Sequence, residues 1–90
     1  MKTQYDAVDI GVVKWTEGDY VIQAYTHPAG VGSSVCLKIK RYSEHDYHHA
    51  VQSGAHRTLY DNVLPPHCTR EDVKNILRRF GCPDSALSSR

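Results

Sequence analysis

The segment from Cys68 to Pro83 constrains the fold most, because a helix start, an apolar stripe and a helix stop agree there. Thr69 can accept a hydrogen bond from a first-turn backbone N–H, and Asp72, three residues later, completes a capping box. Gly81 supplies a left-handed stop, and Pro83 prevents continuation. The apolar residues recur at helical spacing: Val73, Ile76, Leu77 and Phe80. The sequence therefore predicts an amphipathic C-terminal helix that covers a core with one face.

The composition of the whole chain is that of a globular protein. Of its 90 residues, 40% are hydrophobic and 23% are charged, and no low-complexity run interrupts them. The first residues lack the apolar segment of a signal peptide, and no apolar run approaches the roughly 20 residues that span a bilayer. We therefore expect a cytoplasmic protein without a membrane partner, built as a single domain over residues 1–83 with a flexible tail over 84–90.

Apolar alternation in the first and third segments, and aromatic and β-branched residues in the second, predict three strands before the middle of the chain. The first covers residues 8–15 and the second 20–25, and the Gly and Asp of residues 16–19 suit a four-residue hairpin loop between them. A third, half-buried strand covers residues 35–40. The residues expected to face inward in the first and third strands are Val8, Ile10, Val12, Val35, Leu37 and Ile39.

The region after the third strand predicts a short helix. Ser43 with Asp46 three residues later marks its start, Tyr47 belongs to its modest apolar stripe, and Gly54 ends it. Residues 58–63 fit either a fourth strand or a continuation of this helix. We therefore predict an α+β fold with the order β-β-β-α-β-α. It is a small two-layer domain, in which an antiparallel sheet of three to four strands carries the C-terminal helix on one face.

The cysteines give no sign of disulfides or of nucleophilic catalysis. Three cysteines cannot form a closed disulfide framework, which fits a reducing compartment. A catalytic thiolate needs a base and an electropositive setting, and Cys36 beside Lys38 and Cys68 beside His67 each offer only a fragment of that setting. The glycine-rich loop over residues 30–34 lies between strands and lacks the lysine of a phosphate-binding loop. We predict no catalytic residue, no cofactor and no enzyme.

A histidine cluster raises the question of a metal. His45 and His49 are four residues apart, so they can point the same way from the predicted middle helix, and Asp46, or His67 with Cys68, could complete a ligand set. The spacing matches no zinc motif, and the same histidines also fit the solvated face of the helix. We assign no metal ligand, and metal binding stays open as an alternative.

Basic residues are concentrated in the second part of the chain. Residues 1–35 carry two basic against four acidic residues, whereas residues 36–90 carry nine against six. The four basic residues Lys38, Lys40, Arg41 and Arg57 could form a patch beside tyrosines that stack on bases, a combination used by single-strand binding surfaces. No RNA-binding or helix-turn-helix motif accompanies them. A nucleic-acid-binding regulator is therefore an alternative function.

The aromatic residues favour a protein partner. The chain has six tyrosines and one tryptophan but only one phenylalanine, and tyrosine is enriched at protein interfaces because it covers apolar area while its hydroxyl stays hydrated. We therefore predict a small non-enzymatic protein-binding module. An open edge strand also leaves homodimerisation possible. The candidate partner-binding residues are Lys38, Lys40, Arg41, Tyr42, His45, His48, His49 and Arg57.

The general profile resembles small virus- or mobile-element-encoded inhibitors, of which anti-CRISPR proteins are one example. The resemblance consists of chain size and the absence of catalytic motifs, and it involves no diagnostic residue. It implies a protein that acts by occupying a surface of a larger host complex.

Overall fold

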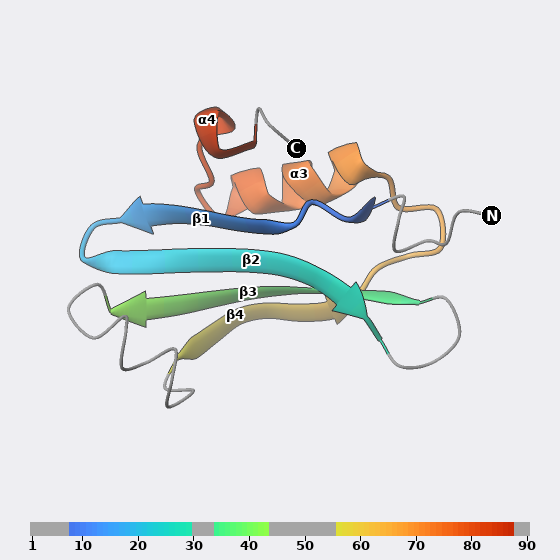
Figure 1. The fold of residues 1–90 in the computed structure, drawn as a ribbon, viewed down its shortest axis with the longest axis horizontal. Coiled ribbons are helices and arrows are strands. Elements are labelled where there is room, and N and C mark those ends of the chain that lie inside the picture. Colours follow the sequence, from blue (N-terminus) through green and yellow to red (C-terminus); the bar gives the residue numbers. More distant parts are fainter. Residues whose placement is uncertain (1–7, 30–33, 44–55, 88–90) are drawn as a thin grey trace.

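The computed structural model describes residues 8–29, 34–43 and 56–87. Its four strands form one antiparallel sheet in the order β1-β2-β3-β4 (Figure 1). The strands are β1 (Val12–Glu17), β2 (Tyr20–Pro28), β3 (Val35–Ser43) and β4 (Arg57–Val63). Two helices follow, α3 (Arg70–Arg79) and α4 (Asp84–Leu87). The predicted α+β fold with an antiparallel sheet and a C-terminal helix is confirmed.

Helix α3 forms where the sequence predicted it, with the predicted cap. The Thr69 hydroxyl accepts a hydrogen bond from the Asp72 backbone N–H at 3.1 Å, and the Asp72 carboxylate accepts one from the Thr69 N–H at 2.9 Å. Beyond the helix, Gly81 has a φ of 90°, in the left-handed region that ends helices. Val73 and Leu77 are fully buried. The apolar stripe therefore packs against the sheet as expected.

The first strand differs from the prediction in the face that it buries. Val8 and Ile10 are buried but precede β1, and within the strand Val13 is buried while Val12 is 45% exposed. The alternation changes at Gly11, which has a φ of 67° and donates its backbone N–H to the Asp9 carboxylate at 2.8 Å. A left-handed residue turns the backbone, so the inward positions shift by one. The expected inward position of Val12 is therefore wrong.

The turn between β1 and β2 is shorter than the predicted four-residue loop. Glu17 pairs with Tyr20, so only Gly18 and Asp19 lie between the strands. Gly18 has a φ of 60°, whereas the φ of Asp19 is not positive. Glycine at the first central position is what a type II′ hairpin turn requires. This tight turn places two carboxylates, those of Glu17 and Asp19, at one end of the sheet.

Strand β3 is longer than expected, and residues 58–63 belong to a strand. Ser43, predicted to begin a helix, pairs instead with Tyr20 as the last residue of β3. The remainder of the predicted middle helix lies outside the described residues. In β4 the pairing shifts between Ile39 and Lys40, which leaves Leu59 as an extra residue between the paired Thr58 and Tyr60. This β-bulge lets both Leu59 and Tyr60 pack against the core.

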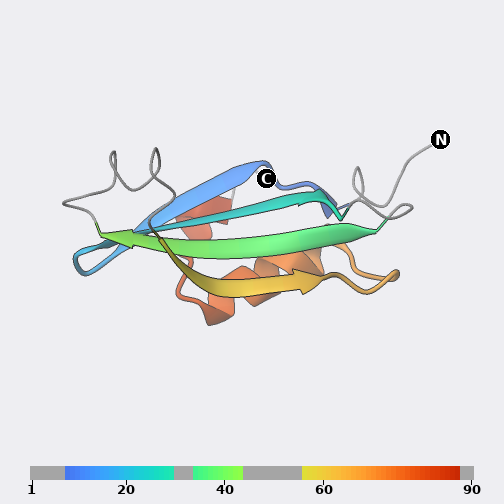
Figure 2. The same ribbon diagram turned by 90° about the horizontal axis from the view of Figure 1, so that it is seen from below.

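Both helices lie on one side of the sheet (Figures 1 and 2). Leu77 of α3 and Leu87 of α4 belong to the same buried cluster as Ile39 of the sheet. Residues 84–87, which belong to the predicted C-terminal tail, form α4, and Leu87 is only 2% exposed. Burial of such a leucine contributes about 1.5–3 kcal/mol toward holding α4 on the core.

Candidate binding surfaces

Strand alternation gives the sheet two chemically different faces. Cross-strand partners share a face, so the register puts Lys14, Gln23 and Lys40 in one row and Tyr25, Lys38 and Asp61 in the next. Within the described residues, neither helix packs on this side. We call this surface the open face and define it by Lys14, Gln23, Tyr25, Lys38, Lys40, Tyr42 and Asp61. The opposite, covered face carries the buried cluster.

A lysine and a tyrosine are in contact at the centre of the open face. The Lys40 ammonium lies 5.5 Å from the centroid of the Tyr25 ring. A hydrogen bond to Tyr25 raises the pKa of Lys40, and this outweighs the lowering caused by partial burial. The Tyr25 ring is also 6.0 Å from the ring of His27, whose Nδ1 lies 2.8 Å from the Pro28 carbonyl oxygen. The face therefore presents aromatic rings beside positive charge.

The cysteine thiols lie in settings that oppose ionisation. Cys36 belongs to the open side of β3, and its thiol donates a hydrogen bond to the Asp61 carboxylate at 3.2 Å. Burial raises the pKa of Cys36, and Asp61 raises it further, whereas Lys38 only partly offsets this. Burial also raises the pKa of Cys68 and of Cys82. A thiolate is thus disfavoured at each cysteine, which is the reverse of what a nucleophile requires.

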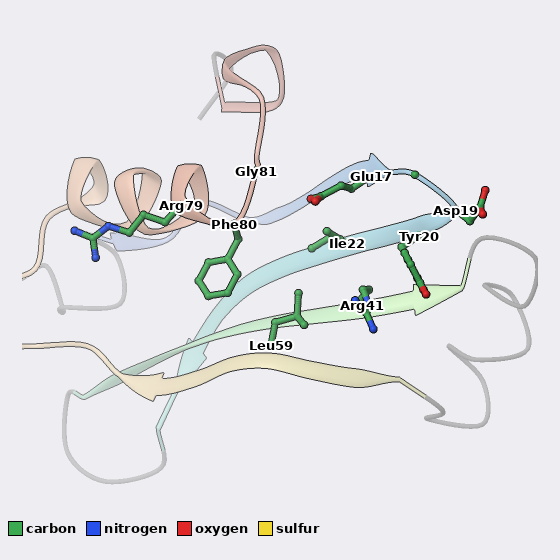
Figure 3. A pocket seen from close by; sticks show the side chains of 10 residues that line it. Glu17, Asp19, Tyr20, Ile22, Arg41, Leu59, Arg79, Phe80 and Gly81 are labelled. Carbon is green, nitrogen blue, oxygen red and sulfur yellow. The ribbon is translucent and has the colours of Figure 1, made fainter.

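A groove of about 760 Å³ lies on the covered side, between the β1–β2 turn and the end of α3 (Figure 3). Its floor is apolar: the Phe80 ring points toward Leu59, with Ile22 beside them. Phe80 is held by an edge-to-face contact with Tyr60, with ring centroids 5.7 Å apart. The complete lining is Glu17, Gly18, Asp19, Tyr20, Ile22, Arg41, Leu59, Arg79, Phe80 and Gly81.

Charges of both signs border this apolar floor. The Arg41 guanidinium stacks over the Tyr20 ring at 4.2 Å from its centroid. The Glu17 side chain reaches toward Gly81, where a Cβ atom would lie only 2.8 Å from its Oε2. Within the described residues, neither Glu17 nor Arg41 takes part in a salt bridge. The groove therefore combines an apolar centre with a carboxylate on one side and a guanidinium on another.

The structure divides the predicted partner-binding residues between the two faces. Lys38, Lys40 and Tyr42 share the open face, as strand alternation requires. Arg41 and Arg57 are cross-strand partners on the other face, and Arg41 lines the groove. Tyr42 is only 7% exposed, and its ring lies 5.6 Å from that of His56. His45, His48 and His49 lie outside the described residues.

Sequence reasoning missed the residues that form the groove and the central tyrosine of the open face. Tyr20, Leu59 and Phe80 come from β2, β4 and the end of α3, so their proximity depends on tertiary packing. Tyr25 lies opposite Lys38 only in the register that the second and third strands adopt. The length of the loop between those strands did not fix that register.

The described residues give no support for a metal centre. No group of three or more His, Cys, Asp or Glu side chains within them is arranged to hold a metal ion. His67 and Cys68 instead line a second, smaller pocket of about 430 Å³ together with Asp72 and Arg79. The sheet order leaves β1 and β4 as its edges in the described part of the chain, so edge-to-edge homodimerisation stays a prediction.

Comparisons with known proteins return no relative of this chain. No protein-family model matches it, and no curated protein or solved structure matches it significantly. Among the described residues, no helix combines the length and apolar character needed to cross a membrane. The chemistry of the open face and of the groove is therefore the basis for assigning a function.

Proposed function

We propose that this chain is a small non-enzymatic protein-binding module, and that its groove takes a segment of a larger partner protein. The observation that carries the proposal is the groove between the β1–β2 turn and α3, with its apolar floor bordered by carboxylate and guanidinium groups. Aromatic residues and arginine are enriched among the residues that dominate binding energy at protein interfaces. Phe80, Tyr20 and Arg41 supply this combination in one place.

The groove specifies the chemistry of the segment. An aromatic or large aliphatic side chain fits over Ile22, Leu59 and Phe80, where it removes apolar surface from water. An acidic group on the segment pairs with Arg41, which is stacked on Tyr20 and so is already oriented. A basic group pairs with Glu17 near the turn. The proposed ligand is therefore an apolar anchor flanked by charges of opposite sign.

Such a module acts by occupation. A bound segment is no longer available to its own assembly, and the chain itself blocks the surrounding surface of the partner. This mode of action requires no catalytic group. The raised pKa values of Cys36, Cys68 and Cys82 support this mode of action, because they keep the thiols protonated and so less nucleophilic.

The proposal is tested by selecting peptides from a random displayed library against the folded chain. We expect the selected peptides to share an apolar anchor with charged neighbours of both signs, and Arg41→Glu to weaken their binding by about tenfold or more. Arg57→Glu is the matched control, since it makes the same charge change on the cross-strand partner outside the groove lining. Failure to select such peptides, or equal losses in both variants, would refute binding at the groove.

A further inference from the structure

The open face carries a second type of binding chemistry, independent of the groove. Three lysines come from two strands, Lys14 from β1 and Lys38 and Lys40 from β3, and they surround Tyr25 of β2. Residues two apart on a strand are separated by about 6–7 Å, and adjacent strands by about 4.8 Å. The ammonium groups are therefore distributed over a surface of about one nanometre around a single aromatic ring.

This distribution matches a chain of phosphates and bases better than it matches a folded protein surface. A positive surface attracts the phosphate backbone, and an aromatic ring that a base can reach stacks on it irrespective of sequence. A base paired within a duplex is stacked on its neighbours and cannot lie flat on a side chain. Tyr25 lies on β2 in the middle of the sheet and is partly exposed, so its ring is the candidate stacking surface.

We propose that the open face binds single-stranded nucleic acid, with Tyr25 stacking on a base and Lys14, Lys38 and Lys40 contacting the phosphates. In the free chain the Lys40 ammonium lies over the Tyr25 ring. In the proposed complex a phosphate takes the place of the ring as the partner of this ammonium, and the ring face becomes available to a base. The same lysine thus covers the stacking surface in the free chain and contacts the backbone in the complex.

Asp61 limits the positive charge of this surface. It lies opposite Lys38 across β3 and β4, and it accepts the hydrogen bond of the Cys36 thiol. A carboxylate in this place repels a phosphate backbone. Its removal therefore has an effect opposite in sign to removal of a lysine: Asp61→Asn is expected to tighten binding severalfold, a change that a merely destabilised sheet would not produce.

The experiment is fluorescence anisotropy with labelled oligo(U) RNA and oligo(dT) DNA of about 12 nucleotides, a length within the range that small binding domains cover. A duplex of the same length and a salt series accompany each titration. Three phosphate contacts predict a slope of log K against log salt near −2, and Lys38→Gln with Lys40→Gln should reduce it to about −0.7. The same double substitution should weaken binding about tenfold at low salt.

Two matched controls separate this surface from general charge and folding effects. Arg41→Gln with Arg57→Gln removes the same charge from the covered side and should leave the slope unchanged. Tyr25→Leu should weaken binding severalfold, whereas Tyr20→Leu, on the same strand but in the groove, should not. Circular dichroism confirms that each variant is folded.

The outcomes are decisive in both directions. Absence of saturable binding at about 50 mM salt, equal losses in the lysine and arginine pairs, or duplex binding as tight as single-strand binding overturns the proposal. The ratio of the dissociation constants for oligo(U) and oligo(dT) shows whether RNA or DNA is the preferred single strand. Because the groove residues are not involved, failure here leaves the peptide-binding proposal untouched.

Discussion

The two faces of the sheet come from the same four strands and have opposite chemistry. The covered face buries Val13, Ala24, Leu37 and Ile39 almost completely, while the open face alternates lysine, glutamine and tyrosine between them. Alternation along a strand makes the two sets independent, because neighbouring residues point in opposite directions. The comparison teaches that adjacent residues of one strand can belong to the core and to a solvated polar face.

The largest expected effect contrasts two neighbours in β3. Leu37 is fully buried, so Leu37→Ala should lower the free energy of unfolding by about 2–5 kcal/mol, through lost burial and the cavity left behind. Lys38 faces the open side, and Lys38→Ala should change it by about 0.5 kcal/mol or less. Urea denaturation measures both. Similar losses in the two variants would show that the open face is also part of the stabilising core.

The next effect concerns two glycines beside the groove. Gly81 and Gly18 both have positive φ, at 90° and 60°, so alanine at either should cost roughly 1–2 kcal/mol of conformational strain. Only at Gly81 would the new Cβ also meet the Glu17 carboxylate, whereas at Gly18 nothing lies within 4 Å. We expect Gly81→Ala to lower the thermal unfolding temperature more than Gly18→Ala does. Adding Glu17→Ala to Gly81→Ala should remove the part of the loss caused by the contact with Glu17, but not the part caused by the positive φ.

The third prediction concerns the cap that positions α3 and, with it, Phe80 of the groove. Thr69→Ala should lower the free energy of unfolding by about 1 kcal/mol, because it leaves a first-turn N–H without its acceptor. A double-mutant cycle with Asp72→Ala measures the coupling between the two reciprocal hydrogen bonds. Strictly additive losses would mean that the capping box does not act as a unit.

The smallest effect is chemical. Raised thiol pKa values leave less thiolate at neutral pH, so Cys36, Cys68 and Cys82 should each be alkylated by iodoacetamide more slowly than free cysteine. The rate of alkylation at each cysteine should keep rising with pH through the ordinary thiol range and level off only above it. At Cys36, Asp61→Asn removes a cause of the raised pKa and should accelerate the reaction. Mass spectrometry follows each site; rapid alkylation of Cys36 at neutral pH in the unmodified chain would contradict its described setting.

Helix α3 could be predicted in full from the sequence, because its cap, stripe and stop are all local signals. The first strand could not, since its inward face depends on the backbone conformation of Gly11, which composition does not reveal. Extension of β3 to Ser43 was also hidden, because Ser43 is equally suited to begin a helix. Local sequence signals therefore predict which segments form helices and strands better than they predict where these elements end and which face they bury.

The candidate binding surfaces were predictable only in part, for the same reason. Alternation correctly put Lys38 and Lys40 on one face, but Arg41 was grouped with them because the expected strand ended at Lys40. The groove unites Leu59 and Phe80, which come from a bulged strand and a helix end. Such a site exists only after the helix packs on the sheet.

The most direct test of two separate binding faces is NMR mapping on one isotope-labelled sample, titrated separately with single-stranded oligonucleotide and with a selected peptide. The account predicts that oligonucleotide shifts the backbone signals of Lys14, Tyr25 and Lys40, while peptide shifts those of Tyr20 and Gly81. If both ligands perturb the same set of residues, or if each perturbs the face assigned to the other, the assignment of separate binding functions to the open face and the groove is wrong.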